Sequence, residues 1–402
     1  MMTGKDDLTK DSQLGSKMKP SRYLPDGRYG MAEIGITDGI RYSGKADVID
    51  QLTAHEAYGF FLSNQTVSLE NGTALSGWEA HRACFHGNFA LCDATSYPDE
   101  LYEDNWTKDN ALKLLSRKPE GKPWFMHVSF PGPHPAFLTT ARMAATVTNR
   151  TWPDPVDALQ DGGKATCTTN TGAHAGEPGL GARNNGSRCN YGAEIENLDR
   201  LFGEVLAKVE ALGEANKTLV CVSSDHGDMM GDHDGWAKSK PWEASASVPL
   251  LCFGPGVQVG KVVADPTATL DLAATFIDYA GAELGANMTS TSLRPVLQGS
   301  ATSVRPFVAS GLDNWRLVVQ QVNGSNSNGS EWYKFVCCKG TCPSAPHNVP
   351  EPVDGWTQLL FRVGEDGDQF DMHDLAAEQP GIVAAMRPLL PEVFGCGGTT
   401  KY

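Results

Sequence analysis

The chain has 402 residues, 40% of them hydrophobic, and a formal net charge of −15 at pH 7. This length is sufficient for one large α/β domain and a smaller second one. The acidic excess argues against a general nucleic-acid-binding or anionic-membrane surface, so an anionic substrate would need a local cationic pocket. No apolar run is long enough to span a bilayer, and we therefore predict no membrane span.

The N-terminal residues, "MMTGKDDLTKDSQLG", lack the apolar segment of a signal peptide. Asn-x-Ser/Thr sequons nevertheless begin at Asn64, Asn71, Asn105, Asn149, Asn185, Asn216, Asn287, Asn323 and Asn328. So many sequons favour the secretory pathway, with an extracellular or lysosome-like destination. Either the sequons are idle in a cytosolic protein, or the true beginning of the protein lies upstream of Met1.

The cysteines differ in their surroundings. Cys221 and Cys252 lie in apolar runs and are expected to be buried thiols. Others lie in polar or terminal segments, where a secreted protein can form disulfides: Cys167, Cys189, Cys337, Cys338, Cys342 and Cys396. Because the sequence has no pair of CxxC motifs, a structural zinc site is not expected.

The first strong element is "WFMHVSF" (Trp124–Phe130), a short apolar run that ends at "PGPHP". It predicts a buried strand that delivers a loop. A polar segment follows from about residue 146 to 190 and is rich in Gly, Asn and Thr. It is too long for a simple connection, and we interpret it as a surface insertion or a lid on the substrate side.

An alternation of helix and strand patterns follows this insertion. Apolar residues recur at helical spacing from Ala193 to Leu212, and the runs "TLVCVSSD" and "VPLLCFGPG" predict strands. "TLDLAATFIDYAG" predicts a helix that ends at Gly281. This order predicts an α/β fold with a largely parallel mixed sheet flanked by helices.

The pattern changes near residue 300. The runs "WRLVVQQV", "EWYKFVCC" and "WTQLLFRV" predict strands, and "GIVAAMRPLLPEVF" predicts a helix limited by its prolines. We therefore divide the chain into a main domain, residues 1–300, and a small C-terminal α+β subdomain, residues 301–402.

The loop "SSDHGDMMGDHDGWAKSKPWEAS" (Ser223–Ser245) concentrates chemically active side chains just after a predicted strand. Asp225 and His226 can reach one metal ion, and Gly227 permits a tight turn behind them. Lys238 is a cation suited to a tetrahedral oxyanion. For an isolated Asp-His-Gly, the simpler interpretation is a capping aspartate among solvated charges.

This loop is not isolated, because the run "SSDHGDMMGDHDGWAKSKPWEASASVPLLCFGPGV" resembles the metal-and-sulfate segment of the sulfatases, in the alkaline phosphatase superfamily. "FMHVSFPGPHPAF" is similar to the family's strand and Pro-His segment, and "FRVGEDGDQFDMHDLAAEQP" is similar to its closing pattern. The resemblance covers most of residues 1–12 and 120–390, with the insertion at 146–190 outside it. It implies an alkaline-phosphatase-like fold.

The resemblance also implies roles for residues. Asp225 and His226 would bind one divalent cation, which we expect to be Ca²⁺, with Mg²⁺, Mn²⁺ or Zn²⁺ as alternatives. Lys238 and His134 would bind the sulfate and offset charge in the transition state. His233 would either orient the substrate or support the loop.

"TGKDDL" (Thr3–Leu8) resembles the family's Gly-Lys-x-His-Leu segment, whose lysine contacts sulfate. Lys5 matches that lysine. Asp7 stands at the histidine position, as in the arylsulfatase K-like branch, and would act as the general acid if its pKa were raised. Without the resemblance, a solvated aspartate is the preferred interpretation.

Two features of the family pattern precede that segment and are expected upstream of Met1. One is a strand with an Asp-Asp metal pair, and the other is Cys/Ser-x-Pro-Ser/Ala-Arg, whose first residue becomes the formylglycine nucleophile. "MKPSR" (Met18–Arg22) has a similar spacing, but methionine cannot become an aldehyde, and we interpret it as a chance match. We therefore expect a sulfatase that lacks its N-terminal part and is inactive as written.

Two alternatives remain open. One is a phosphomonoesterase or phosphodiesterase of the same superfamily, which the scarcity of histidines after residue 257 (His347 and His373) disfavours. The other is a non-catalytic protein that binds sulfated glycans through the residual pocket. In each sulfatase-like interpretation the partner is a sulfated small molecule or polysaccharide, selected by residues 146–190 and by Gly59–Cys92.

Overall fold

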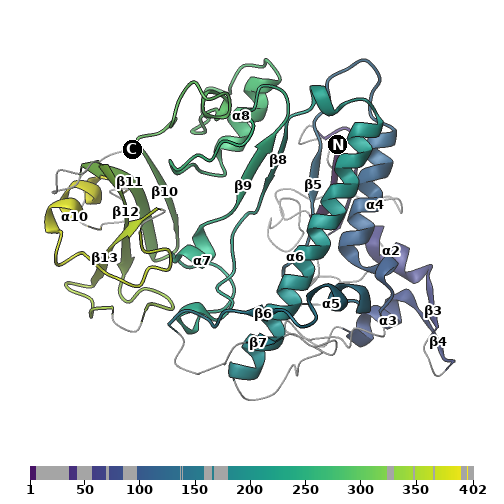
Figure 1. Cartoon of the computed structure of the whole chain (residues 1–402), viewed down its shortest axis with the longest axis horizontal. Coiled ribbons are helices and arrows are strands. Elements are labelled where there is room, and N and C mark those ends of the chain that lie inside the picture. The colour runs from purple at the N-terminus through teal and green to yellow at the C-terminus, as the bar shows by residue number, and fades with distance from the viewer. Residues whose placement is uncertain are drawn as a thin grey trace, which may run out of the picture. The chain divides into compact units, whose positions relative to one another are not determined.

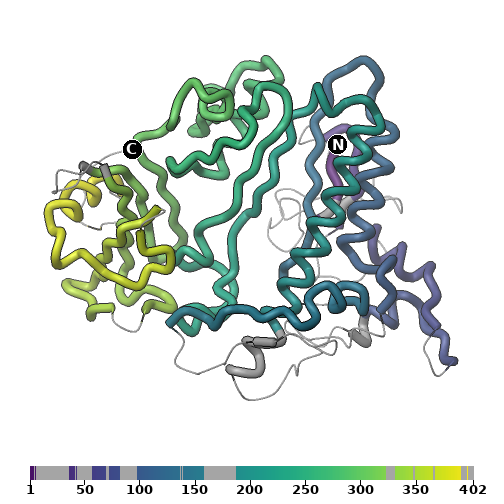
Figure 2. Tube along the Cα trace, in the orientation of Figure 1, coloured from purple at the N-terminus to yellow at the C-terminus, as the bar shows by residue number. Residues whose placement is uncertain are grey.

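The structure is a computed structural model that describes residues 1–5, 36–42, 57–68, 72–84, 97–135, 137, 139–157, 165–166, 180–323, 330–346, 349–364, 367–390 and 396. The chain forms two compact units (Figures 1 and 2). Unit 1 comprises Met1–Asp154 and Gln160–Ala215, and unit 2 comprises Pro155–Leu159 and Asn216–Tyr402. The boundary that we predict at residue 300 lies inside unit 2 and stays a prediction.

Unit 1 contains a parallel sheet of three strands in the order β2-β1-β5. The central strand β1 (Met2–Lys5) pairs with β2 (Gly39–Tyr42) on one side and with β5 (His127–Ser129) on the other. β5 confirms the strand predicted from "WFMHVSF", although it is shorter. The predicted burial is wrong, because His127 is exposed and Val128 and Ser129 are only half-buried. Parallel strands end at the same edge of a sheet, so β1 and β5 deliver their following residues together.

Among its described residues, unit 1 has five α-helices: α2 (Ala57–Ser63), α3 (Gly77–Cys84), α4 (Glu103–Ser116), α5 (Ala141–Val147) and α6 (Leu180–Ala211). Two small antiparallel pairs accompany them: β3 (Thr66–Ser68) with β4 (Ala74–Ser76), and β6 (Thr151–Trp152) with β7 (Ala165–Thr166). α4 and α6 run side by side (Figure 1). An aromatic cluster fills the interior, with Tyr42 edge-on to Trp106.

Helix α6 confirms the helix predicted from Ala193, but it begins thirteen residues earlier, at Leu180. The end of the predicted insertion is therefore helical despite its Gly and Asn content. Tertiary contacts explain the difference: the amide of the buried Asn190 donates to the carbonyl of Phe137 at 3.0 Å. A Cβ at Gly192 would lie 2.4 Å from the ring of Trp152, so only glycine permits this packing.

Unit 2 begins with an antiparallel pair, β8 (Val220–Ser223) and β9 (Leu250–Phe253). The short helices α7 (Glu243–Ala246), α8 (Asp271–Tyr279) and α9 (Arg294–Leu297) accompany this pair. β8, β9 and α8 confirm the elements predicted for this region. β8 and β9 are antiparallel, whereas the three-stranded sheet of unit 1 is parallel, so the fold contains both kinds of strand pairing.

An antiparallel sheet of four strands ends the chain: β10 (Phe307–Leu312), β11 (Trp315–Asn323), β12 (Ser330–Lys339) and β13 (Trp356–Val363). α10 (Pro380–Met386) packs on it and leads into a 3₁₀ turn, Arg387–Leu389. The strands predicted after residue 300 and the proline-limited helix are thus confirmed. None of the helices in the described residues is long and apolar enough to cross a membrane.

The cysteine prediction is wrong for Cys221 and Cys252. These residues face each other directly across β8 and β9, with their Cα atoms 4.2 Å apart, and form a disulfide. They are half-buried, not enclosed in the core. Pairing across two strands brings the thiols together, which the apolar surroundings alone do not reveal. Disulfides also join Cys337 to Cys396 and Cys338 to Cys342.

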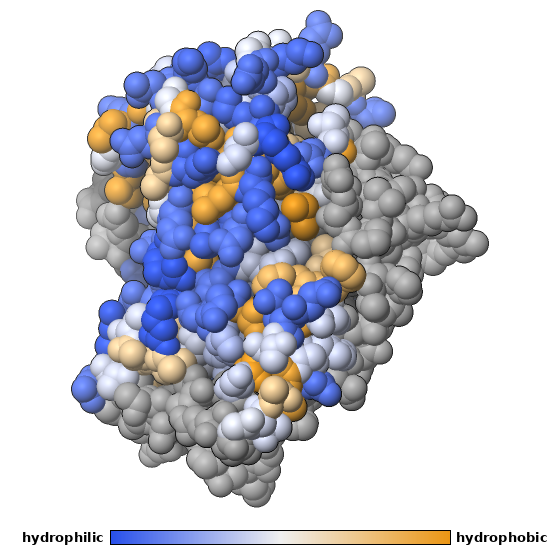
Figure 3. Space-filling view, turned by 90° about the vertical axis from the view of Figure 1, so that its right-hand side faces the viewer, coloured by the Kyte–Doolittle hydropathy of each residue, from blue (hydrophilic) through white to orange (hydrophobic). Residues whose placement is uncertain are grey.

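Figure 3 shows one face of the molecule, on which hydrophilic residues are interspersed with separate small apolar areas. Scattered apolar residues of this kind are ordinary for a protein surface. This face therefore offers no extended apolar area among its described residues.

Candidate active site

The candidate residues divide between the two units. Lys5 and His134 belong to unit 1, whereas Asp225, His226, His233 and Lys238 belong to unit 2. Asp7 and the segment Met18–Arg22 lie outside the described residues. We describe each half by itself.

The half in unit 1 lies at the carboxyl edge of the parallel sheet. Gly4 of β1 is in register with Ser129 of β5, so Lys5 and the turn that carries His134 leave the same edge. Ligands of open α/β folds bind at this edge of the sheet. The topology therefore brings Lys5 and the turn of His134 to one edge of the sheet.

The turn that carries His134 is tightly held. The backbone N–H of His134 donates to the carbonyl of Pro131 at 3.0 Å, and the Gly132–Pro133 peptide is cis. His134 Nδ1 lies 2.5 Å from the carbonyl oxygen of Pro135. A carbonyl can only accept, so the proton is on Nδ1 and the lone pair is on Nε2.

Asp104 holds this turn from beneath, a role that the sequence does not predict. It is buried in the first turn of α4, and its Oδ1 accepts from the backbone N–H of Gly132 at 3.0 Å. A Cβ at residue 132 would lie 2.5 Å from Asp104 Oδ2, so the carboxylate packs directly on the glycine. The only sequence signal is an acidic first turn, which favours a helix N-terminus in any protein.

The half in unit 2 starts with Asp225 and His226, two residues beyond β8. Asp225 Oδ2 lies 3.4 Å from His226 Nε2, and the Asp225 side chain is 71% exposed. His226 Nδ1 lies 2.9 Å from the carbonyl oxygen of Gly227, which places the proton on Nδ1. In the neutral imidazole with this tautomer the lone pair is on Nε2, the ring nitrogen near the Asp225 carboxylate, which is the arrangement that a shared cation would use.

The separation of these two donors suits a shared cation. Ligands bound at about 2.0–2.6 Å to one ion lie about 3 Å apart when they are adjacent. Among the described residues, no group of three or more His, Cys, Asp or Glu side chains gathers around one point. Asp225 and His226 therefore fit a cation as part of a ligand set.

Gly227 lets the chain turn closely behind this pair. Its N–H donates to the carbonyl of Ser245 at 2.9 Å, and a Cβ would lie 2.1 Å from the carbonyl oxygen of Ala244. No side chain fits there, so glycine is required. The segment "WEAS" thus supports the turn after β8 through the backbone of Ala244 and Ser245.

Asp228 closes the loop, and the sequence analysis does not single it out. Its Oδ1 accepts from the backbone N–H groups of Met230 at 3.0 Å and Ala237 at 3.1 Å, so it ties the two limbs together. Burial raises the pKa of Asp228, although these two bonds and the nearby His226 and Lys238 oppose the shift. Asp228, His226 and Lys238 thus lie in one electrostatic neighbourhood.

The two lysines of the loop have different environments. Lys240 Nζ donates to the carbonyl of Trp236 at 2.7 Å, and burial lowers the pKa of Lys240. The ammonium group of Lys240 is therefore used in a hydrogen bond within the loop. Lys238 lies between Ala237 (φ 58°) and Ser239 (φ 74°), two non-glycine residues in the left-handed region. Such conformations are costly and concentrate at functional sites.

His233 is buried and makes its contacts within the protein. Its Nε2 donates to the carbonyl of Phe370 at 3.0 Å, and its backbone N–H donates to the carbonyl of Val156 at 2.7 Å. Asp157 Oδ2 lies 3.5 Å from Nδ1. Of the two roles predicted for His233, these contacts favour support of the loop.

The loop is also anchored to the four-stranded sheet. Trp242 is fully buried, and its Nε1 donates to the carbonyl of Pro343 at 2.7 Å. Trp315 Nε1 donates to the carbonyl of Ser239 at 3.0 Å. Both rings belong to an apolar cluster with strands β11 to β13, so this sheet fixes where the loop lies.

A buried ion pair completes the anchor. Lys334 Nζ donates to Asp371 Oδ2 at 2.7 Å and lies 3.3 Å from Glu243 Oε2. The same Asp371 oxygen accepts from the backbone N–H of Glu243 at 2.7 Å. Burial raises the pKa of Asp371, and Lys334 opposes that rise.

Comparison with protein families gives one match: the profile described as Sulfatase matches residues 47–282. Among curated relatives, an arylsulfatase of Clostridium perfringens is 26% identical over 220 residues, 53% of this chain and 45% of its own. Arylsulfatase K of Danio rerio is 30% identical over 222 residues, 53% of this chain and 38% of its own. The matches thus span less than half of these relatives.

Solved structures with the same fold include a phosphonate monoester hydrolase from Silicibacter pomeroyi, with a TM-score of 0.52 and 21% identity. The match covers 76% of this chain and 65% of that one. A protein solved with its substrate D-glucosamine-2-N,6-O-disulfate gives a TM-score of 0.53 at 15% identity, over 83% of this chain and 75% of that one. At these identities the likeness shows the fold alone, which is alkaline-phosphatase-like α/β as predicted.

Proposed function

The chain belongs to the sulfatase family, and from this premise we propose that the protein hydrolyses sulfate esters of a carbohydrate. The observation that carries the proposal is the loop after β8. It combines Asp225 and His226 at 3.4 Å, a His226 tautomer that presents Nε2, and Lys238 between two left-handed residues. An exposed cation-binding pair beside a lysine is suited to a sulfate group.

The roles in this proposal follow from the chemistry of each side chain. Asp225 and His226 would hold one divalent cation, with Ca²⁺ our first candidate, and the cation would supply Lewis-acid polarisation of a sulfate oxygen. Lys238 would pair with a sulfate oxygen. Lys5 and the Nε2 of His134, at the edge of the parallel sheet in unit 1, are further groups suited to sulfate oxygens.

A carbohydrate is the proposed substrate class. The arylsulfatase relatives support sulfate ester chemistry, and the neighbour complexed with a disulfated glucosamine supports a sugar ester. The excess of acidic residues in the chain confines anion binding to local cationic groups such as Lys238. The phosphonate monoester hydrolase makes phosphorus esters the alternative substrate to test.

A secretory location is part of the proposal. Asn64, Asn149, Asn216 and Asn287 are exposed and begin sequons, and the three described disulfides suit an oxidising compartment. Asn105 is buried and donates to the carbonyl of Asp99, so we expect that sequon to stay unmodified. Glycopeptide mass spectrometry of the secreted protein checks both statements.

The test uses the whole secreted protein, with any residues that precede Met1 in the cell, because we expect residues 1–402 alone to lack the nucleophile. It is assayed with Ca²⁺ and three substrates: nitrophenyl sulfate, nitrophenyl phosphate and a nitrophenyl phosphonate monoester. We expect hydrolysis of the sulfate alone, lost in Lys238→Ala and retained in Lys217→Ala, an exposed lysine outside the loop. Preference for either phosphorus ester would overturn the sulfatase assignment.

Thermal unfolding separates binding from hydrolysis. Sulfate at about ten times its Kd should stabilise the folded chain by about 1.4 kcal/mol, and Lys238→Ala should abolish this effect. Stabilisation without turnover would replace the enzyme proposal by a non-catalytic sulfate-binding protein. If sulfate neither binds nor reacts, both proposals fail.

A further inference from the structure

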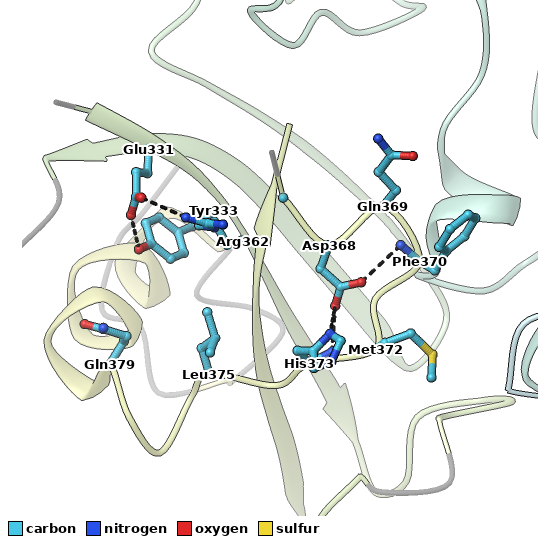
Figure 4. A pocket seen from close by; sticks show the side chains of 11 residues that line it. Glu331, Tyr333, Arg362, Asp368, Gln369, Phe370, Met372, His373, Leu375 and Gln379 are labelled. Atoms are coloured by element: carbon cyan, nitrogen blue, oxygen red, sulfur yellow. Dashed lines mark hydrogen bonds and ion pairs between the residues drawn. The ribbon is translucent and has the colours of Figure 1, made fainter. Parts of the chain in front are cut away.

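A separate pocket lies in unit 2, between the strands β12 and β13 and the segment 367–379 (Figure 4). Its volume is about 680 Å³. Pockets that bind small molecules have volumes of about 300–1,000 Å³. No residue of the proposed sulfate site lines it.

Two carboxylates are held in fixed positions in this pocket. Glu331 accepts from the hydroxyl of Tyr333 at 2.7 Å and from Arg362 at 3.1 Å. Asp368 accepts from the backbone N–H groups of Phe370 and His373 at 3.2 and 2.6 Å. These contacts, drawn in Figure 4, orient the polar groups before any ligand enters.

The charge of the lining is unsuited to a sulfate group. Glu331 and Asp368 carry two negative charges at neutral pH, against one positive charge on Arg362. The hydrogen bonds from Tyr333 and Arg362 lower the pKa of Glu331, so it remains ionised well into the acid range. An anionic ligand would meet a net negative surface, whereas an uncharged one would not.

The remaining polar groups suit hydroxyl groups. Within the described part of the chain, no hydrogen bond uses the side-chain amides of Gln369 and Gln379. The His373 side chain is 82% exposed. Each amide can donate and accept at once, which is what a sugar hydroxyl requires of its partner.

Apolar groups complete the lining. Met372 and Leu375 offer aliphatic surface, and the Phe370 ring is 51% exposed at the end of the pocket. A pyranose ring has C–H faces that are apolar and edges that are rich in hydroxyls. Few ligand classes match amides, carboxylates and apolar side chains at the same time.

We propose that this pocket binds an uncharged saccharide unit. The identification of that unit with an unsulfated sugar of the substrate chain rests on the proposed function; the binding itself does not. Sulfated and unsulfated sugars would thus be bound at different places in one unit.

The wall of the pocket is joined to the metal-binding loop. The carbonyl of Phe370 accepts from His233, and the carboxylate of Asp371 accepts from the backbone N–H of Glu243. The segment that recognises the sugar is therefore fixed to the segment that carries Asp225 and His226. A glycan chain held in the pocket would thus lie against a segment that is hydrogen-bonded to that loop.

The test is saturation-transfer NMR on the full chain with cellobiose as the probe. We expect binding that weakens about tenfold in Gln369→Ala/Gln379→Ala, because two hydrogen bonds are lost. Gln321→Ala, an exposed glutamine of β11 outside the lining, should bind cellobiose as the unaltered chain does. Circular dichroism checks that each variant is folded.

A sulfated probe makes the outcomes distinguishable. Glucose monosulfate should bind with a dependence on Lys238 and without dependence on Gln369 and Gln379. If cellobiose does not bind, or binds equally to the double variant, the pocket proposal is overturned while the sulfate site stands. If only the Lys238 dependence is missing, the proposed function fails and the saccharide pocket stands.

Discussion

Unit 2 contains two antiparallel regions that differ sharply in burial. β8 and β9 deliver the candidate site, yet every residue of β8 is only half-buried, and Leu251 of β9 is 63% exposed. The four-stranded sheet carries none of the residues proposed to bind the cation or the sulfate, yet Phe335, Leu359 and Leu360 on it are fully buried. The region that carries the chemistry is thus the less buried of the two.

This difference shows that one region carries the site residues and another region holds them in place. The strands bring Asp225 and His226 to the surface, whereas Trp242, Trp315 and Lys334 fix the loop against the four-stranded sheet. Exposed positions tolerate the polar, strained conformations that a site needs, and the buried sheet supplies the compensating stability. Variants in each region should therefore have different consequences.

The largest expected effect is the loss of the buried ion pair. Asp371→Ala leaves Lys334 buried without its closest partner, and we expect it to lower the free energy of unfolding by about 3–5 kcal/mol. Denaturant unfolding measures this. Arg362→Ala, which breaks a pair of exposed side chains, is the matched control and should cost at most about 1 kcal/mol. If the two variants lowered the free energy of unfolding equally, the buried ion pair would contribute no more to stability than the exposed one.

The second effect concerns the disulfide across β8 and β9. Cys221→Ser/Cys252→Ser opens a loop of 31 residues' separation, whereas Cys338→Ser/Cys342→Ser opens one of 4. On the loop-closure argument, the first should cost about 3–4 kcal/mol and the second about 2 kcal/mol. If loss of the Cys338–Cys342 disulfide lowers the free energy of unfolding more than loss of Cys221–Cys252, the stability of β8 and β9 does not depend on their disulfide.

A smaller effect is expected within the loop. Asp228→Ala leaves the N–H groups of Met230 and Ala237 without an acceptor, at a cost of about 1–3 kcal/mol. Hydrogen exchange at these two amides should accelerate, while exchange in β12 stays unchanged. Asp228→Asn keeps an acceptor oxygen and should be milder. Loss of protection in β12 as well would show that the loop and the sheet unfold together.

The smallest effect is a pH dependence at the edge of the four-stranded sheet. Hydrogen bonds from Tyr333 and Arg362 lower the pKa of Glu331 in the folded state. Its stabilisation is therefore present above its unfolded pKa and is lost as the pH falls through the folded pKa. Because the side chain is 41% exposed, we expect less than about 1 kcal/mol.

Comparison of Glu331→Gln with the unaltered protein at pH 7 and in acid measures this effect. The difference between the two proteins should be largest at pH 7 and should disappear in acid. A difference that grows in acid would show that the sign of the pKa shift is wrong.

Residues named by a local motif could be predicted, and residues defined by long-range contacts could not. The strand before Asp225, the tight turn at Gly227 and the partnership of Asp225 with His226 follow from short sequence patterns. Asp104 was missed because its partner, the N–H of Gly132, is 28 residues away. The disulfide between Cys221 and Cys252 was missed for the same reason.

Other differences arise because tertiary contacts override local preference. The Gly- and Asn-containing start of α6 is helical since Asn190 and Gly192 pack against Phe137 and Trp152. Lys240 and Lys238 are nearly identical in sequence context, but only the folded loop shows that Lys240 donates inward. The sequon at Asn105 is likewise indistinguishable from the others until its burial is known.

The attachment of Val156 to the turn at Asp232 and His233 has an evolutionary consequence. Val156 donates to Asp232 Oδ1 at 3.0 Å and accepts from the backbone N–H of His233 at 2.7 Å, within the segment proposed to select the substrate, residues 146–190. Both bonds on the Val156 side use its backbone, so they constrain no side chain there. Mutation can therefore diversify the sequence that follows while the turn keeps its geometry. Selection can thus change the substrate range of the protein without changing the geometry of its site.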